Sequence, residues 1–183
     1  RKESSAASDV YKRQEQGVAV LLTHLRSLRH ESITYFYAKD SWLDESVLQA
    51  LRTGCEQAGL TLHTVGNVGD NLESGCRAVS AWRKYLDSAV VFCGSLSAIG
   101  FMQELSRSLK VTVPDDVSVV AVGDVFTGHL LQTRTTTLEV PDRKIGVEAV
   151  RQLVSQIRHR SRSENRAKLV NMRLVNGDTT GFF

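Results

Sequence analysis

Apolar residues recur along the chain in two alternating patterns, helical spacing and short continuous runs. Helical spacing first appears between residues 18 and 28, where Leu21, Leu22 and Leu25 repeat at intervals of three and four. Apolar, β-branched runs predict strands at 32–38, 60–65, 88–93 and 117–122. Helical patterns separate these runs at 45–58, 72–86 and 97–109. The alternation predicts an α/β fold with a parallel sheet that helices cover on both faces.

The pattern is less regular after the fourth predicted strand. Residues 125–137 form a looser segment, and a long helix is expected at about 143–160. The apolar positions of that helix form one stripe, which is typical of a helix side that faces a core. They are Val147, Val150, Leu153, Val154 and Ile157. A basic polar loop (158–168) and a final strand (169–175) follow.

Composition narrows the class of protein. The chain has 183 residues, of which 42% are hydrophobic and 23% charged, the proportions of a globular protein. A net charge of +3 is too small to indicate a nucleic-acid surface, and no apolar run is long enough to span a membrane. The three cysteines lack CxxC or Cys/His spacing, so we expect no disulfide framework, no metal site and a reduced, cytoplasmic setting.

Small and polar residues follow each predicted strand. In parallel sheets the ligand crevice lies at the carboxyl ends of the strands, so function is expected there. The residues at those ends are Lys39, Asp40, Asp70, Cys93, Gly94, Ser95, Gly123 and Asp124.

Ser95 has three interpretations: a nucleophile, a ligand contact or a helix N-cap. A nucleophile needs a base and an oxyanion site, and the surrounding sequence is not Gly-x-Ser-x-Gly. The one plausible base is His129, five residues past Asp124. The sequence therefore favours a ligand contact or an N-cap.

The order of motifs resembles the effector-binding region of the lac/galactose repressor family. The stretches "VVFCGSLSAIGFMQEL", "VPDDVSVVAVGD" and "TTTLEVPDRKIGVEAV" carry the resemblance, which covers roughly residues 16–181. It implies a periplasmic-binding-protein-like sensor with two lobes built on parallel sheets, the second lobe complete and the first partial.

Compared with that family, the chain is expected to be truncated at its N-terminus. Residues 1–14 would be a non-native or disordered tail, and residues 15–30 and 133–160 a remnant of the first lobe. Residues 31–132 and 169–181 would form the second lobe.

The family's ligand contacts carry over poorly. The family has an Asn-Asp pair at the turn between the third strand and the next helix. When the sequences are aligned on Ala98-x-Gly100, this pair falls on Gly94 and Ser95. When they are aligned on Cys93, the aspartate is deleted. The first acid at the end of the fourth strand is replaced by Gly123, and the family's arginine falls on Val47. Hydrogen bonds from charged groups contribute roughly 1.5–3 kcal/mol each, so the crevice is expected to bind its ligand differently, weakly or not at all.

The candidate ligand-binding residues are Ser95, Gly123, Asp124, Trp42 and Asp70. Trp42 lines either the crevice or the lobe surface. Asp124 serves either a ligand or neighbouring backbone amides, and Asp70 serves either a ligand or an ordinary turn.

The resemblance implies the sensor domain of a bacterial transcription regulator rather than an enzyme. It would bind a small-molecule effector, a sugar or related metabolite, act as a homodimer, and control DNA through an absent N-terminal domain. No cofactor and no membrane partner are expected. A transport-type periplasmic sugar-binding protein would share the fold, and an α/β hydrolase that uses Ser95 is the enzymatic alternative.

Overall fold

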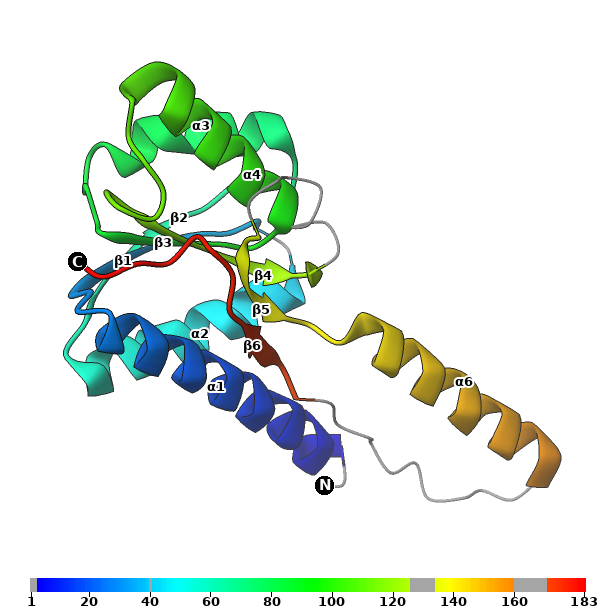
Figure 1. The fold of residues 1–183 in the computed structure, drawn as a ribbon. Helices are drawn as coiled ribbons and strands as arrows, with labels where there is room; N and C mark the ends of the chain where they lie inside the picture. Colours follow the sequence, from blue (N-terminus) through cyan, green and yellow to red (C-terminus); the bar gives the residue numbers. More distant parts are fainter. Residues whose placement is uncertain (1–2, 40, 126–133, 160–170) are drawn as a thin grey trace.

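The computed structural model describes residues 3–39, 41–125, 134–159 and 171–183, and its centre is one six-stranded sheet (Figure 1). The strand order is β2-β1-β3-β4-β5-β6, with β1 to β5 parallel and β6 antiparallel to β5. The strands are β1 (Ser32–Phe36), β2 (Thr61–Val65), β3 (Ala89–Phe92), β4 (Ser118–Gly123), β5 (Thr136–Glu139) and β6 (Arg173–Val175).

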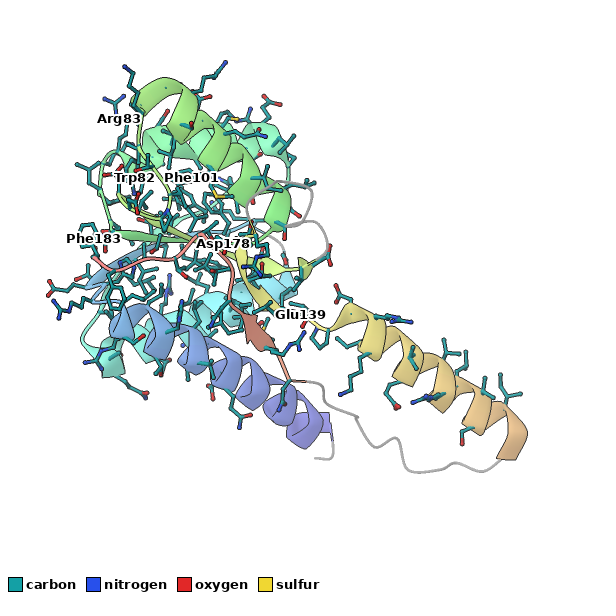
Figure 2. All side chains as sticks on the ribbon, viewed as in Figure 1. Trp82, Arg83, Phe101, Glu139, Asp178 and Phe183 are labelled. Carbon is teal, nitrogen blue, oxygen red and sulfur yellow. The ribbon has the colours of Figure 1, made fainter. Side chains whose placement is uncertain are left out.

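Helices cover both faces of this sheet, as Figure 1 shows. Helices α1 (Glu3–Ser27) and α2 (Trp42–Ala58) pack on one face, where Ile33 and Tyr35 point. Helices α3 (Leu72–Trp82) and α4 (Ser95–Glu104) pack on the other, over Phe36 and Phe92. Figure 2 shows Trp82 and Phe101 in the layer between these helices and the sheet, where their rings meet edge to face.

The predicted α/β class is confirmed, and so are the four predicted strands and the helices between them. Pattern analysis missed β5, which lies partly inside the segment 125–137 that was expected to be loose. Its sequence, Thr-Thr-Leu-Glu, shows no apolar run. Its threonines are nevertheless buried: Thr136 finds hydrogen-bond partners in the C-terminal segment, and the hydroxyl of Thr137 donates to the backbone carbonyl of Thr135. The long helix is confirmed as α6 (Asp142–His159), whereas most of the predicted basic loop lies outside the described residues.

Residues 15–30, which we assigned to a first lobe, lie in the same packed body as the sheet. Leu21 and Leu25 of α1 are fully buried against α2 and the strands. Strand β5, from the second segment assigned to that lobe, pairs with β4. Helix α1 begins at Glu3, within the segment expected to be a tail. The division of the chain into a tail and two lobes stays a prediction.

Helix α6 projects away from the sheet (Figures 1 and 2). Its apolar stripe was expected to face a core, but Val150 is 61% and Ile157 68% exposed. Among the described residues, therefore, the stripe is a solvent-facing surface. The expectation rested on amphipathic spacing, which identifies an apolar face without identifying what covers it.

Two glycines let α3 and α4 cross at very short distance. A Cβ on Gly75 would lie 2.0 Å from the carbonyl oxygen of Ser97, and one on Gly100 would lie 2.1 Å from that of Leu72. Both neighbours are backbone atoms, which cannot move aside by changing a rotamer. The contact therefore fixes where α4 begins, at the carboxyl end of β3.

We expect Gly100→Ala to lower the free energy of unfolding by about 2 kcal/mol or more, because the added methyl group forces the helices apart. Gly146→Ala in α6 is the matched control: a Cβ there meets nothing within 4 Å. It should raise stability by about 0.5–1 kcal/mol through helix propensity. Urea unfolding of both variants measures the difference, and equal stabilities would contradict the close crossing.

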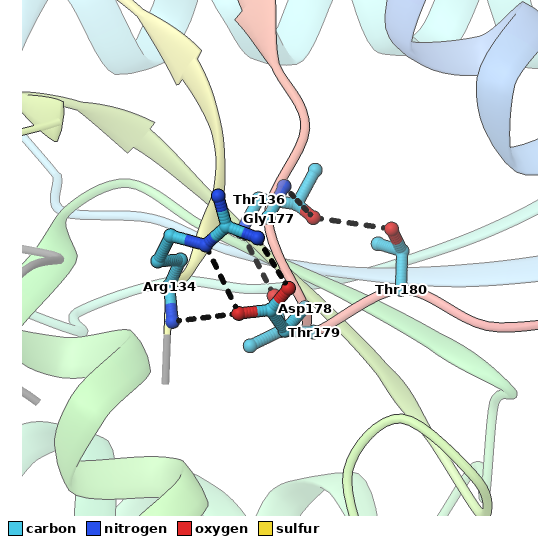
Figure 3. A network of polar contacts seen from close by, with 6 residues as sticks. All are labelled: Arg134, Thr136, Gly177, Asp178, Thr179 and Thr180. Carbon is cyan, nitrogen blue, oxygen red and sulfur yellow. Dashed lines mark hydrogen bonds and ion pairs between the residues drawn. The ribbon is translucent and has the colours of Figure 1, made fainter. Parts of the chain in front are cut away.

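The C-terminal segment, residues 177–183, crosses the amino-terminal edge of the sheet and is called the strap below. Figure 3 shows the Asp178 carboxylate accepting from both the guanidinium and the backbone N–H of Arg134. Thr179 Oγ1 accepts from Thr136 N–H at 2.9 Å and donates to the carbonyl of Val119 at 2.6 Å. The strap thus joins the beginnings of β4 and β5.

His30 connects the strap to the rest of this edge. Its ring is 3% exposed, with Nδ1 2.8 Å from Ser88 Oγ and Nε2 2.9 Å from Ser118 Oγ. Ser118 Oγ also accepts from Gly181 N–H of the strap, and the imidazole stacks on Phe183. Burial is the main cause that lowers the pKa of His30 below its ordinary value of 6.5, and the nearby His24 lowers it further.

This lowered pKa predicts that stability falls in mild acid. Above pH 6.5 the histidine is neutral in both states; below it the unfolded chain binds a proton that the folded chain resists, so stability is lost as pH falls. The loss is at most about 1.4 kcal/mol per pH unit for one such group. Urea unfolding at pH 7.5 and 5.5 should show a smaller loss for His30→Gln than for the unaltered chain. Equal losses would contradict the assignment.

Candidate functional site

The carboxyl ends of the parallel strands β1 to β5 meet at one edge of the sheet, called the strand-end edge below. A cavity of about 520 Å³ opens there between the ends of β4 and β5 and the beginning of α6. Its lining residues are Asp124, Glu139, Val140, Pro141, Asp142, Arg143, Lys144 and Val147. Among the candidate site residues whose side chains the structure describes, Asp124 is the one that lines this cavity.

Ser95 ties two of the loops at this edge together. It is the first residue of α4, only 4% exposed, and its Oγ donates to the backbone carbonyl of Asp124 at 2.8 Å. The N-cap of α4 is Gly94, which has no side chain to accept a hydrogen bond. The N-cap interpretation of Ser95 is therefore wrong, and its role as a ligand contact stays a prediction.

Asp70 provides the cap that Gly94 lacks. Its Oδ1 accepts from the backbone N–H of Ser97, in the first turn of α4, at 3.1 Å. A Cβ on Gly94 would lie 2.1 Å from both Cγ and Oδ1 of Asp70, so this carboxylate occupies the space of a side chain at position 94. The neighbouring Asn71 caps α3 by accepting from Ser74 N–H at 2.8 Å. The loop after β2 therefore caps two helices with two consecutive side chains.

The end of β4 has a conformation that favours glycine. Gly123 has φ +143°, in a region that L side chains rarely adopt, which explains why no acid stands there. Its carbonyl accepts from Val140 N–H at 2.9 Å and so joins β4 to the residue that follows β5. Asp124 comes next and is exposed. Gly123 offers a ligand backbone groups only, and a contact with a ligand stays a prediction for both residues.

The beginning of α2 is organised by Asp44, which sequence reasoning missed. Ser41 Oγ accepts from Asp44 N–H at 3.3 Å, and Asp44 Oδ2 accepts from Ala38 N–H at 3.0 Å. The spacing Ser-x-x-Asp resembles a capping box and could have identified it. Asp44 is 5% exposed, and burial raises the pKa of its carboxyl. Trp42 is the first residue of α2, and its side chain lies outside the described part of the structure.

Cys93 and Tyr35 also lie beneath this edge, and burial disfavours the ionised form of both. Burial raises the pKa of Cys93 to about 12 and also raises that of Tyr35 above its ordinary value, with neighbouring Asp44 adding to both. Cys93 Sγ donates to the carbonyl of Val68 at 3.4 Å. A neutral thiol is a poor nucleophile, so Cys93 offers no covalent chemistry.

The described residues do not assemble a hydrolase site around Ser95. The ring of His24 binds Thr180, that of His30 binds Ser88 and Ser118, and that of His63 binds Asp87. His129, the predicted partner, lies outside the described residues. Within the described ranges no group of three His, Cys, Asp or Glu side chains could hold a metal ion, and no helix there is long and apolar enough to cross a bilayer.

This arrangement is an α/β fold with helices on both faces of a mostly parallel sheet and hydrogen-bonding groups at its carboxyl edge. Comparison with known proteins agrees. The sequence pattern of the periplasmic binding protein-like domain matches residues 22–180, and the chain belongs to that family. The resemblance to sensor domains of the lac/galactose repressor family is thereby confirmed.

Individual relatives point the same way. The chain is 26% identical over 160 residues to the arabinose metabolism transcriptional repressor of Geobacillus stearothermophilus, covering 80% of this chain and 42% of the repressor. A LacI family regulator of Enterococcus faecium, solved with bound ribose, superposes with a TM-score of 0.82 at 15% identity over 93% of this chain and 64% of its own.

A LacI family regulator of Arthrobacter sp. FB24, solved in complex with lactose, gives a TM-score of 0.77 at 21% identity over 91% of this chain and 63% of its own. At these identities the solved structures show the shared fold. The chain spans less than half of the curated repressor and less than two thirds of either solved chain.

Proposed function

We propose that this chain is the effector-sensing part of a bacterial transcription regulator and that it binds a sugar at the strand-end edge. The observation that carries the proposal is the family match over residues 22–180 together with the polar groups at that edge. The similar repressor and the regulators solved with ribose and lactose support a sugar as the effector class.

The mechanism follows from where the site lies. Asp124 and the beginning of α6 line one cavity, and α6 follows the sheet without packing on it. A ligand there contacts both the sheet and the segment that leads away from it. Binding would favour one orientation of that segment over others, and this difference in affinity is what couples an effector to a distant site. The distant site would be a DNA-binding segment outside this sequence, in a cytoplasmic homodimer.

Calorimetric titration of the chain with arabinose, ribose and lactose tests the proposal. We expect one of these sugars to bind, and Asp124→Asn to weaken it about 10- to 100-fold by replacing a carboxylate acceptor with an amide. Asp115→Asn is the matched control, because Asp115 is exposed in the loop that precedes β4, at the opposite edge. Absence of heat with every sugar, or equal weakening by both variants, would refute sugar binding at this site.

A further inference from the structure

The strap (177–183) is attached to the sheet mainly by hydrogen bonds. Thr179 is its one buried residue, and Phe182 and Phe183 are 75% and 64% exposed. None of its residues belongs to the two apolar clusters that join the helices to the sheet. A segment with few buried apolar contacts opens locally at a lower free energy than the whole fold. The strap is therefore able to leave the sheet while the sheet stays folded.

Two histidines from the end of α1 and the turn before β1 hold this segment. His24 Nε2 lies 3.0 Å from Thr180 Oγ1. His30 Nε2 lies 2.9 Å from Ser118 Oγ, which also accepts from the backbone N–H of Gly181 at 3.0 Å. Each imidazole is thus joined to the strap, the first directly and the second through one hydroxyl group.

The surroundings of both rings favour the neutral imidazole. Among the described residues, their nitrogen atoms bind hydroxyl groups, those of Thr180, Ser88 and Ser118, and no hydrogen bond joins either ring to a carboxylate. Burial is the main cause that lowers the pKa of both histidines below 6.5, and His24 lowers the pKa of His30 further. A proton on either ring is therefore better accommodated when the ring reaches water.

The charged groups near the two rings have other partners or face solvent. The Asp87 carboxylate accepts from Thr34 and His63, and that of Asp178 accepts from Arg134. The other charged residues on the surrounding elements are all exposed, and they are Arg26, Arg29, Glu31, Arg83, Lys84, Lys110, Asp115 and Asp116.

We propose that the strap is released by mild acid: when His24 and His30 take up protons, residues 177–183 leave the beginnings of β4 and β5 while the sheet remains folded. The strap lies against both rings, with Thr180 bound to His24 and Phe183 stacked on His30. Its departure exposes the rings to water, so protonation and release favour each other.

The direction of the effect follows from the lowered pKa values. Above pH 6.5 both histidines are neutral whether the strap is attached or released, so attachment is strongest there. Below pH 6.5 the released state binds protons that the attached state resists, and attachment weakens as the pH falls. Release also frees the backbone N–H groups of Val119 and Thr136, which bind Thr179 in the attached state. The amino-terminal edge then gains unpaired hydrogen-bonding groups in acid only.

Hydrogen exchange of a ¹⁵N-labelled chain, measured by nuclear magnetic resonance at pH 7.5 and 5.5 and corrected for the intrinsic exchange rate, tests the proposal. The reporter amides join the strap to the rest of the fold, and they are those of Val119, Thr136, Asp178 and Gly181. We expect their protection factors to fall by about 3- to 100-fold between the two pH values, since each histidine contributes at most about tenfold over this range. Unchanged protection would overturn the proposal.

Dilute urea distinguishes release of the strap from unfolding of the sheet. Local release exposes little surface, so exchange of the reporter amides should be faster than that of the β3 amides (89–92) and nearly independent of urea. Exchange from β3 requires more extensive unfolding and should accelerate with urea. Reporter amides that exchange as slowly as those of β3, with the same urea dependence, would show that the strap leaves only when the sheet unfolds, and would overturn the proposal.

The variants assign the effect to the two histidines. A chain with both His24→Gln and His30→Gln keeps polar side chains that do not titrate, so the fall in reporter protection should disappear. His63→Gln is the matched control, because His63 binds Asp87 and not the strap, and it should retain the fall. A full fall in the double variant, or its loss in the control, would contradict the assignment. If the double variant does not fold, each single variant should show a smaller fall than the unaltered chain, and an undiminished fall in both would overturn the proposal.

Discussion

The parallel alignment of β1 to β5 is the constraint on which the rest of this molecule depends. Parallel strands need a crossover between each pair, and the crossover helices must cover both faces of the sheet. These five strands then end at the same edge, which collects loops from distant parts of the sequence. Helix α4 begins at that edge because it follows β3 directly, and the close crossing at Gly75 and Gly100 sets how tightly α3 packs against it.

The two edges of the sheet are stabilised by different chemistry. At the strand-end edge, single hydrogen bonds join neighbouring loops: Asp70 to Ser97, Ser95 to Asp124, and Asp44 to Ala38. At the amino-terminal edge, the strap forms a dense network of threonines, His30 and an Arg–Asp pair (Figure 3). Binding is therefore expected at the less densely connected edge, where a ligand can rearrange loops without unfolding the sheet.

The sequence predicted those helices and strands whose burial follows a local pattern, and it missed those that depend on contacts between distant residues. Apolar periodicity predicted the strands and helices around Ile33, Phe36 and Phe92, because burial on a strand or helix is a local pattern. It missed β5, whose burial depends on the strap more than forty residues later. It also identified the apolar stripe of α6 without revealing that the stripe is exposed, since an amphipathic face does not reveal its partner.

The roles of the candidate site residues were harder to predict than the fold, for the same reason. In a parallel sheet, the polar residues that follow the strands gather at one edge, so the sequence indicated Asp70, Ser95 and Asp124 as candidates. Their roles were not: Asp70 caps a helix that begins 25 positions later, and the glycine at 94 exists to make room for it. Neither spacing nor composition contains that information, because it arises only when two loops of the sheet lie side by side.

The central claim is that the strand-end edge binds a neutral sugar, and amide shift mapping by nuclear magnetic resonance tests it most directly. A ¹⁵N-labelled chain would be titrated with arabinose, ribose or lactose. We predict shifts at residues 68–71, 94–97 and 123–125, with the strap (177–183) unchanged. Shifts confined to the strap, or none with any of these sugars, would contradict binding at the strand-end edge.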